Sequence, residues 1–199
     1  MHYGFLDESG ILERKAREGS YFVVSVMIVA NPAEIKDVMK IVRRKARGKF
    51  RISSSFHAYK EGAGVVGLVL EELAKRDVGI VIGVWDKRKR KSKMPKNTLY
   101  GRILAQTVRS ALKLYPKLNL VLHKRYNDPE IINRINNELE RVLEPGQELS
   151  IDHKTEVVRR ELELADAVAW AVFQKYNRKK EDFYKIIEGR IKKESRLAA

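Results

Sequence analysis

The feature of the sequence that most restricts its fold is the run Tyr21-Phe-Val-Val-Ser-Val-Met-Ile-Val29, in which Ser25 alone interrupts the apolar residues. A strand this apolar is typical of a sheet that is buried on both faces. A shorter segment, residues 3–8, precedes it across the polar connection 13–20, so we predict that the two strands form a hairpin. A further run, residues 78–85, has the same character and predicts another buried strand.

Stretches with apolar residues at helical spacing separate these strands. The order strand, helix, strand predicts parallel pairing and a single α/β domain, with a mixed central sheet and helices on its faces. We assign residues 1–180 to this domain and residues 181–199 to a charged helix and tail, which would cover the domain edge or support a homodimer. We expect helices over residues 33–45, 65–76, 97–114, 129–143 and about 156–176, and further strands over 118–122 and 149–151.

The charge of the chain bears on its partners. Its 199 residues include 41 Lys and Arg against 26 Asp and Glu, a net charge of +15. This excess favours nucleic acid as a partner, although heat-adapted proteins also carry many charges. The chain has no cysteine, so a metal would bind through oxygen or imidazole. No apolar run approaches the roughly 20 residues of a membrane helix, and the first residues lack a signal-peptide pattern, so we expect a cytoplasmic protein without a membrane partner.

Carboxylates end or border several of the predicted buried elements. Asp7 and Glu8 end the first strand, Asp86 ends the third, and Glu163 and Asp166 lie on adjacent turns of one face of the last helix. Ionised groups leave water at a high cost unless they are paired or bound to a cation. Because Mg²⁺ and Mn²⁺ prefer oxygen ligands, we expect a metal site formed by Asp7, Asp86, Glu163 and Asp166. The alternatives are that Asp7 and Glu8 lie in a polar turn and that Asp86 caps a helix or turn.

Histidine is the usual residue for proton transfer near neutral pH. His57 ends a short extended piece, residues 53–58, and His153 follows the strand over 149–151. Either could transfer a proton or orient a phosphate, although a lone histidine is more often structural. The candidate catalytic set combines one histidine with four of the acids: Asp7, Glu8, His57, Asp86 and Asp166.

A strongly basic run follows Asp86 directly. Like charges repel and the run has no apolar anchor, so we expect an exposed loop that is either merely solvated or a clamp on phosphates beside the acids. We favour the clamp. Another basic segment, Arg43-Arg-Lys-Ala-Arg47, suits a helix C-terminus or contact with phosphates. The candidate nucleic-acid-binding residues of the run are Lys87, Arg88, Lys89, Arg90, Lys91, Lys93 and Lys96.

Two motifs resemble those of a known family, the domain of unknown function 3800. One is Asp7-Glu-Ser-Gly10 at the end of a first strand, and the other is Leu162-Glu-Leu-Ala-Asp-Ala-Val-Ala169, similar to the family's late Leu-Gln-Leu-Ala-Asp-like helix. The resemblance covers most of residues 3–176. It implies a ribonuclease H-like fold in which a short strand ends in a histidine, here His57. The chain departs from the family at Glu163, where Gln is more usual, and at His123, where an acid often lies near a strand end.

The acids, the basic charge and the resemblance together predict a divalent-metal nuclease. Asp7 and Asp166 would converge across the end of the sheet and bind Mg²⁺ or Mn²⁺ for hydrolysis of phosphodiester bonds in DNA or RNA. Two ions about 4 Å apart could activate water and stabilise the leaving oxygen. One alternative is a non-catalytic nucleic-acid-binding module with a degenerate site, in which the acids form structural pairs. Another is an enzyme that acts on a different phosphate substrate.

Overall fold

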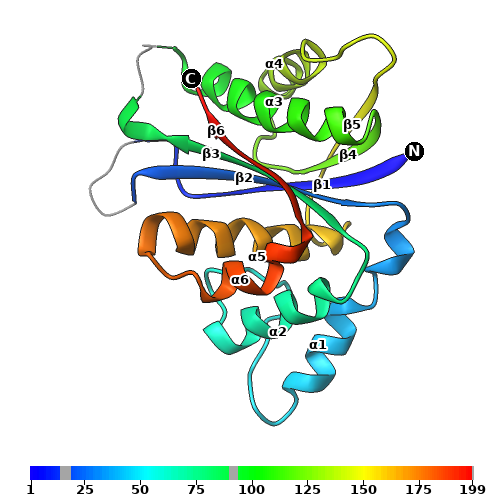
Figure 1. Ribbon diagram of the computed structural model, residues 1–199, viewed down its shortest axis with the longest axis vertical. Coiled ribbons are helices and arrows are strands. Elements are labelled where there is room, and N and C mark those ends of the chain that lie inside the picture. The colour runs from blue at the N-terminus through cyan, green and yellow to red at the C-terminus, as the bar shows by residue number, and fades with distance from the viewer. Residues whose placement is uncertain (14–18, 90–93, 199) are drawn as a thin grey trace.

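One mixed β-sheet forms the centre of the molecule. The computed structural model describes residues 1–13, 19–89 and 94–198, and within them six strands pair in the order β5-β4-β1-β2-β3-β6 (Figure 1). The predicted hairpin is confirmed, because β1 and β2 pair antiparallel. β4 lies parallel to β1 and to β5. The strands are β1 (His2–Ser9), β2 (Tyr21–Val29), β3 (Gly79–Asp86), β4 (Lys117–His123), β5 (Glu148–Lys154) and β6 (Ile191–Leu197).

The pairing of β2 with β3 corrects one expectation from the sequence. The order strand, helix, strand predicted parallel neighbours, but these strands are antiparallel, with Ile28 opposite Gly79. The intervening segment contains two helices in succession, α1 (Val38–Ala46) and α2 (Ala63–Ala74), and it returns the chain to the end of the sheet that it left. A connection with one crossover helix would instead have carried the chain back to the opposite end.

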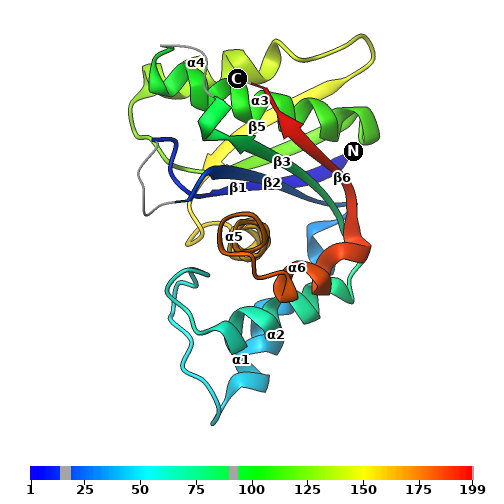
Figure 2. The same cartoon turned by 60° about the vertical axis from the view of Figure 1, so that its left-hand side comes forward.

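Helices cover both faces of the sheet, as the apolar strands required. One face packs against α3 (Lys96–Leu114) and α4 (Pro129–Glu140), and the other packs against α5 (Glu161–Phe173) with α1, α2 and α6 (Asp182–Ile187) beneath it (Figures 1 and 2). Side chains alternate between the two cores along each strand, so that Phe5 faces α5 and Leu6 faces α3. The predicted single α/β domain with a mixed, helix-covered sheet is confirmed.

The segment 181–199 is not the charged helix and tail predicted from its composition. Its described part forms the short helix α6 and then β6, which pairs in parallel with β3 and closes that edge of the sheet. An edge strand can expose one face to water, so its many charges are compatible with the sheet. Glu194 on β6 accepts hydrogen bonds from the hydroxyls of Tyr176 and Tyr184.

The last long helix begins later than its sequence pattern suggested. Residues 155–160 form turns, and α5 starts at Glu161. The β-branched pair Val157-Val158 is a poor helix former, and both side chains are exposed, so packing does not recover the cost. Glu156 therefore lies in the turn that leads to α5. Among the described residues, no helix is long and apolar enough to cross a membrane.

Candidate functional site

The alternation of β1 sends its two acids to opposite faces of the sheet. Asp7 faces α5, on the same side as Phe5, and its side chain is buried. One of its oxygens accepts the backbone N–H of Glu8 at 2.8 Å. Glu8 faces the other layer, where its Oε1 lies 2.6 Å from Nη1 of Arg125. Adjacent in sequence, the two carboxylates therefore lie in different surroundings, one without a strong cationic partner and one in an ion pair.

His123 lies beside Asp7 because the end of β4 runs parallel to the end of β1. Leu6 is opposite Leu122 in the parallel register, so the next residue of each strand points to the same face. The His123 Nδ1 lies 3.7 Å from Asp7 Oδ1, and its Nε2 lies 3.1 Å from Glu156 Oε2. This histidine is the departure noted from the resembled family, and it links the acid of β1 to an acid of the 155–160 turns.

Two carboxylates of α5 fix the segment that carries His57. Glu163 Oε1 accepts the backbone N–H of Phe56 at 3.1 Å, and Asp166 Oδ2 accepts that of Ala58 at 2.8 Å. His57 is therefore anchored on both sides, and its Nε2 lies 3.8 Å from Glu156 Oε1.

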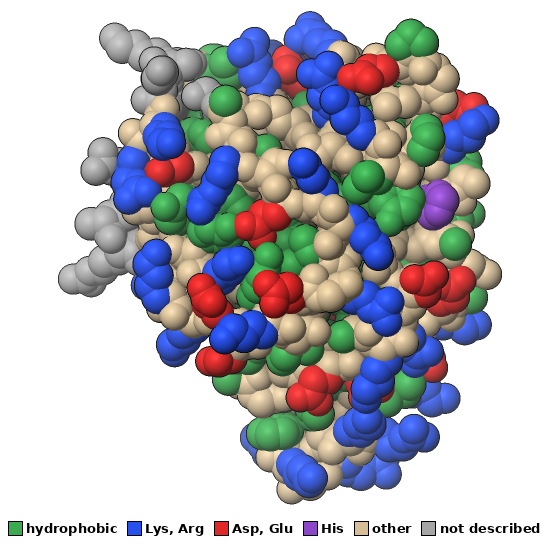
Figure 3. All heavy atoms as spheres, in the orientation of Figure 1, with side chains coloured by type: hydrophobic (Ala, Val, Ile, Leu, Met, Phe, Trp, Pro, Cys, Tyr) green, Lys and Arg blue, Asp and Glu red, His purple; other side chains and the backbone are tan. Residues whose placement is uncertain are grey.

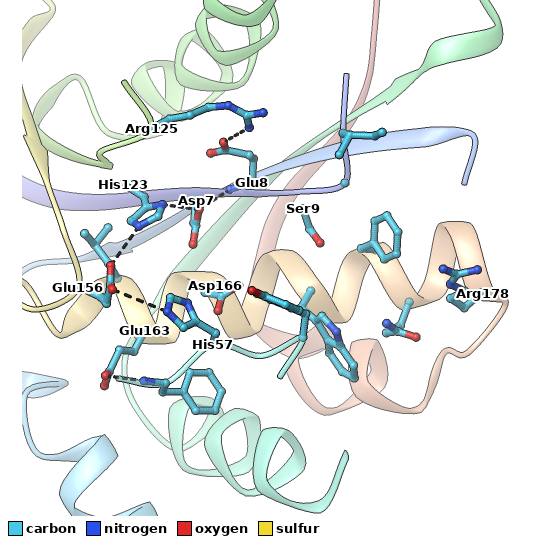
Figure 4. A pocket seen from close by; sticks show the side chains of 18 residues that line it. Asp7, Glu8, Ser9, His57, His123, Arg125, Glu156, Glu163, Asp166 and Arg178 are labelled. Atoms are coloured by element: carbon cyan, nitrogen blue, oxygen red, sulfur yellow. Dashed lines mark hydrogen bonds and ion pairs between the residues drawn. The ribbon is translucent and has the colours of Figure 1, made fainter. Parts of the chain in front are cut away.

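These side chains line one cavity of about 620 Å³, a volume within the usual range for ligand sites. Asp7 and Asp166 point into the same space from β1 and α5, and His57 and His123 lie beside them (Figure 4). Asp7 and Asp166, which the sequence predicts to converge at the end of the sheet, thus line the same cavity. Other lining residues include Glu8, Ser9, Arg125, Glu156, Glu163 and Arg178.

The cavity carries negative charge that the protein does not fully compensate. Burial raises the pKa of Asp7 well above 3.8, and the nearby charges of Glu8 and Asp166 raise it further. Burial also raises the pKa of Asp166 and of Glu163. For Glu156 burial acts in the same direction, but hydrogen bonds from its own backbone, His123 and Ser55 outweigh it and lower its pKa. Like charges held together in this way attract a proton or a cation.

These shifts predict that the metal-free protein becomes more stable on mild acidification. Asp7, Asp166 and Glu163 have higher pKa values in the folded state than in the unfolded state. Protonation of these groups therefore stabilises the fold. This stabilisation is fully present when the pH is below their pKa values in the unfolded state, and it is lost as the pH rises through their pKa values in the folded state. Each additional bound proton changes the free energy of unfolding by about 1.4 kcal/mol per pH unit. Urea unfolding in a chelator should show a higher midpoint at about pH 5 than at about pH 7.5.

The variant Asp7→Asn provides the control for this pH dependence, because it removes the group whose pKa is raised most strongly by its surroundings. Its unfolding midpoint should change less between the two pH values than that of the wild type. Carboxylates with lowered pKa values, such as Glu156, lose stability only below about their ordinary pKa of 4.5, outside this window. His153, whose pKa burial lowers from 6.5, opposes the trend inside the window, but it does so equally in the wild type and in Asp7→Asn. A wild-type midpoint that falls on acidification would contradict the arrangement of charges described here.

Asp86 does not reach this cavity, although it lies at the same end of the sheet. It is opposite Tyr21 at the start of β2, whereas Asp7 is opposite Ser25, so the two acids differ by four positions along β2. That offset is about 13 Å along the strand direction. Hydrogen bonds from Arg88 at 2.8 Å hold Asp86 and, with its charge, lower its pKa. The prediction that Asp86 joins the acids of the cavity is therefore wrong. The alternative, that Asp86 caps a turn, agrees with the hydrogen bonds that it accepts from Arg88.

His153 is also remote from the cavity. It is opposite Leu122 in the register of β4 and β5, so it faces α4 and not α5. Its Nε2 lies 2.8 Å from Asn136 Oδ1, and burial lowers its pKa. Of the two histidines considered from the sequence, His57 is the one that lies beside the acids.

The basic run after Asp86 is only partly an exposed loop. Lys87 is buried and its Nζ lies 3.4 Å from the carbonyl of Glu13, while Arg88 is held by Asp86 and by the hydroxyl of Tyr21. Lys96 begins α3 and forms an ion pair with Glu13. Lys87 and Arg88 therefore stabilise the turn after β3. Lys89 ends that turn, and Arg90, Lys91 and Lys93 lie outside the described residues.

Sequence patterns did not identify two residues that complete the site. Glu156 was assigned to the last helix, and nothing in its neighbourhood marks it as functional, yet its carboxylate contacts His123, His57 and Ser55. Arg125 follows β4 by two residues and reaches Glu8 from there. The ends of β1 and β4 as parallel neighbours would have indicated both, but that pairing becomes visible only in the folded chain.

The cavity suits a divalent cation by its chemistry, although its ligands are not preassembled. Within residues 1–13, 19–89 and 94–198, no three His, Asp or Glu side chains converge as a ready metal cluster. The donors present are carboxylate oxygens and imidazole nitrogens, which hard and borderline divalent ions accept. One oxygen of Glu163, Oε2, is buried without a hydrogen-bond partner, and Asp7 is destabilised by neighbouring negative charge. A cation bound among these carboxylates would offset this uncompensated charge.

Comparisons with known proteins bear on the fold. No protein-family model matches the chain, and no match was found among curated proteins. Among solved structures, the chain is similar to the crystal structure of ribonuclease H2 from Pyrococcus horikoshii OT3, with a TM-score of 0.55 and 14% identity. The match covers 94% of this chain and 76% of that chain. The similarity confirms the predicted ribonuclease H-like fold, and at this identity it shows the fold alone.

Proposed function

We propose that the protein is a divalent-metal-dependent nuclease that hydrolyses phosphodiester bonds of DNA or RNA. The observation that carries the proposal is the convergence of Asp7 and Asp166 in one cavity, from the first strand and a late helix, with burial raising both pKa values and the charge of Asp166 raising that of Asp7 further. The ribonuclease H-like fold and the net charge of +15 support it. So does the resemblance of the two acidic motifs to the domain of unknown function 3800.

Asp7, Asp166 and Glu163 are the residues that would hold Mg²⁺ or Mn²⁺. A bound ion of this kind lowers the pKa of water and stabilises negative charge on phosphate oxygens. His57 is the residue that we assign to proton transfer at Nε2, because its segment is fixed to α5 and that nitrogen faces Glu156. Glu156 and His123 would hold the neighbouring side chains of the cavity in one rotamer, since each of the two contacts two other groups there.

Two arginines on the cavity wall favour an anionic substrate. Arg125 is compensated by Glu8 but remains partly exposed, and Arg178 lies at the opposite end of the cavity (Figure 4). Guanidinium groups bind phosphate oxygens through paired N–H donors. A phosphodiester would thus enter between arginines and approach acids that repel it unless a cation intervenes, which makes the reaction dependent on metal.

A non-catalytic nucleic-acid-binding module is the second candidate, and one observation favours it. Glu8 is neutralised by Arg125, and β4 contributes His123 where the resembled family often has an acid. In that case the acids would be structural, and the basic charge alone would bind the phosphate backbone. Metal binding and cleavage distinguish the two candidates.

The first test is thermal unfolding with and without Mn²⁺ or Mg²⁺. An ion that binds the folded state alone stabilises it by RT ln(1 + [L]/Kd), about 2.7 kcal/mol at a hundredfold excess over Kd. We expect the melting temperature to rise with Mn²⁺ and the rise to disappear in Asp166→Asn. The matched control is Asp77→Asn, since the side chain of Asp77 is 98% exposed and does not line this cavity.

Cleavage assays on single-stranded and duplex forms of DNA and RNA complete this test. The nuclease proposal requires metal-dependent cleavage of at least one of these substrates by the wild type and by Asp77→Asn. Absence of a metal-induced shift together with retained binding to nucleic acid would favour the binding module instead.

A further inference from the structure

A second hollow, of about 710 Å³, lies on the outer surface of α1 and holds a concentration of positive charge. We call it the α1 hollow. Its basic residues recur every three or four positions, so they share one face of the segment around α1. Figure 3 shows Lys and Arg side chains gathered over the end of the molecule where α1 lies. The six basic residues of the hollow are Lys36, Lys40, Arg43, Arg44, Arg47 and Arg160.

Most of this charge is not compensated within the described part of the protein. The acid of the hollow, Asp37, is already paired with Arg76, whose Nη2 lies 3.2 Å away. For Lys36, Lys40, Arg44 and Arg47 no ion pair is formed among residues 1–13, 19–89 and 94–198. Like charges placed together repel one another and lower stability, so an anion that enters the hollow would be bound favourably.

The α1 hollow adjoins the acidic cavity through a single pair of side chains. Arg43 lines the hollow and Glu163 lines the cavity, and Arg43 Nη2 lies 3.9 Å from Glu163 Oε1. The same guanidinium donates to the carbonyls of Ser53 and Ser54 at 2.7 and 3.1 Å, just before the segment that carries His57. Arg160 is three residues before Glu163 at the start of α5. The two concave sites are therefore adjacent, with the buried Glu163 and the segment before His57 between them.

An acidic cavity next to an uncompensated basic hollow matches the needs of a polyanionic chain. A small phosphate compound would occupy one site, whereas a strand with a phosphate at every nucleotide would occupy both. We propose that the α1 hollow binds phosphates of a nucleic-acid strand whose reactive phosphate lies in the acidic cavity. This inference rests on the proposed function and adds the direction in which the strand leaves the cavity, over the segment 53–58 toward α1.

The test is the quadruple variant Lys36→Gln, Lys40→Gln, Arg44→Gln and Arg47→Gln. It spares Arg43 and Arg160, which contact or neighbour Glu163. The probe is fluorescent oligodeoxythymidylate, with affinity measured over a range of salt in a chelator, so that binding is read without cleavage. For single strands the slope of log K against log salt falls by about 0.7 for each phosphate that the protein no longer neutralises, hence by up to about 3 here. We expect at least a roughly tenfold loss of affinity at low salt.

The matched control removes the same charge elsewhere. Lys113, Lys185, Lys192 and Lys193 are exposed and line neither hollow nor cavity, so their replacement by Gln should leave most of the affinity and slope unchanged. An equal loss in both variants would overturn the proposal in favour of a general charge effect. Far-ultraviolet circular dichroism and melting temperature confirm that both variants fold, and relief of repulsion should raise the stability of the first.

Two further measurements define the ligand and the path. With Mg²⁺ in place of the chelator, so that the acids can accept a phosphate, a dinucleotide should bind the wild type and the quadruple variant equally, because it reaches only the acidic cavity. An equal loss for short and long probes would contradict a strand path. Polyglutamate should compete weakly, and strong competition that the quadruple variant abolishes would assign the hollow to acidic protein segments. If the wild type binds the long probe through α1 but cleaves no substrate, the path is retained and the nuclease proposal fails separately.

Discussion

Replacement of Asp7 by Asn should abolish metal-dependent cleavage while leaving the fold intact. Partners of metal ligands typically contribute 10–100-fold to metal affinity or activity, so loss of a ligand itself should cost at least about a hundredfold in kcat/KM. Asn keeps an oxygen that can accept the N–H of Glu8, as Asp7 does at 2.8 Å. It removes a buried charge that Glu8 and Asp166 oppose. The melting temperature in a chelator should therefore hold or rise.

Nucleic-acid binding should survive this substitution. The residues that would supply affinity are basic and untouched, and one negative charge fewer reduces repulsion of the phosphate. Asp77→Asn serves as the matched control, since that acid is exposed and its replacement should change neither cleavage nor melting temperature. Marked destabilisation of Asp7→Asn, with no metal-dependent cleavage by the wild type, would identify Asp7 as a structural acid paired with His123.

The replacement Arg125→Gln should destabilise the protein by about 1 to 3 kcal/mol, between the values for an exposed and a buried ion pair. Arg125 lies 2.6 Å from Glu8, and the two side chains are only 27% and 7% exposed. Burial opposes the charge of Arg125, but Glu8 outweighs it and raises the pKa of the guanidinium. The guanidinium also stacks near the rings of Tyr100 and Tyr126. Without it, the Glu8 carboxylate loses its ion pair beside Asp7, and its Oε2 already lacks a hydrogen-bond partner.

A double-mutant cycle isolates this interaction. Glu8→Gln together with Arg125→Gln should be more stable than Arg125→Gln alone, because no unpaired carboxylate is left in the interior. Arg141→Gln is the comparison for an exposed pair, since Arg141 is 69% exposed and lies 2.7 Å from Glu138, and it should cost less than about 1 kcal/mol. Equal unfolding free energies for Arg125→Gln and Arg141→Gln would show that Glu8 is solvated in solution and not held in a buried pair.

The sequence was informative about the fold wherever burial alone decided the structure. Runs such as Tyr21–Val29 must be covered on both faces, and helical periodicity supplied the covering elements, so the α/β architecture followed. The direction of β3 did not follow, because parallel pairing was inferred from the order of elements alone, whereas the two successive helices expected over 33–45 and 65–76 return the chain to the same end of the sheet. The strand at Ile191–Leu197 was missed because an edge strand shows little apolar alternation.

The site was predictable to the extent that a local motif marked it. Asp7 and Asp166 lie among apolar residues, where an acid is unexpected, and this contrast can be seen in the sequence itself. Glu156 lies among polar residues and gives no such contrast, so its contact with His123 at 3.1 Å depends on the pairing of β1 with β4 and on the turn before α5. The prediction for Asp86 is wrong because the sequence shows only that this residue ends a strand. It does not show how far that strand extends beyond β1 at the same end of the sheet.

The placement of β6 at the edge of the sheet has a consequence for synthesis on the ribosome. β3 is buried along almost its whole length, yet its partner on that side is made of residues 191–197. Chains are translated at about 5–20 residues per second, so the edge of β3 emerges about 5–20 s before the strand that covers it. During that interval an apolar edge with unpaired backbone groups is open to other nascent chains. Chaperone demand should therefore be greatest late in translation, after the acidic cavity has all its residues and before the sheet is closed.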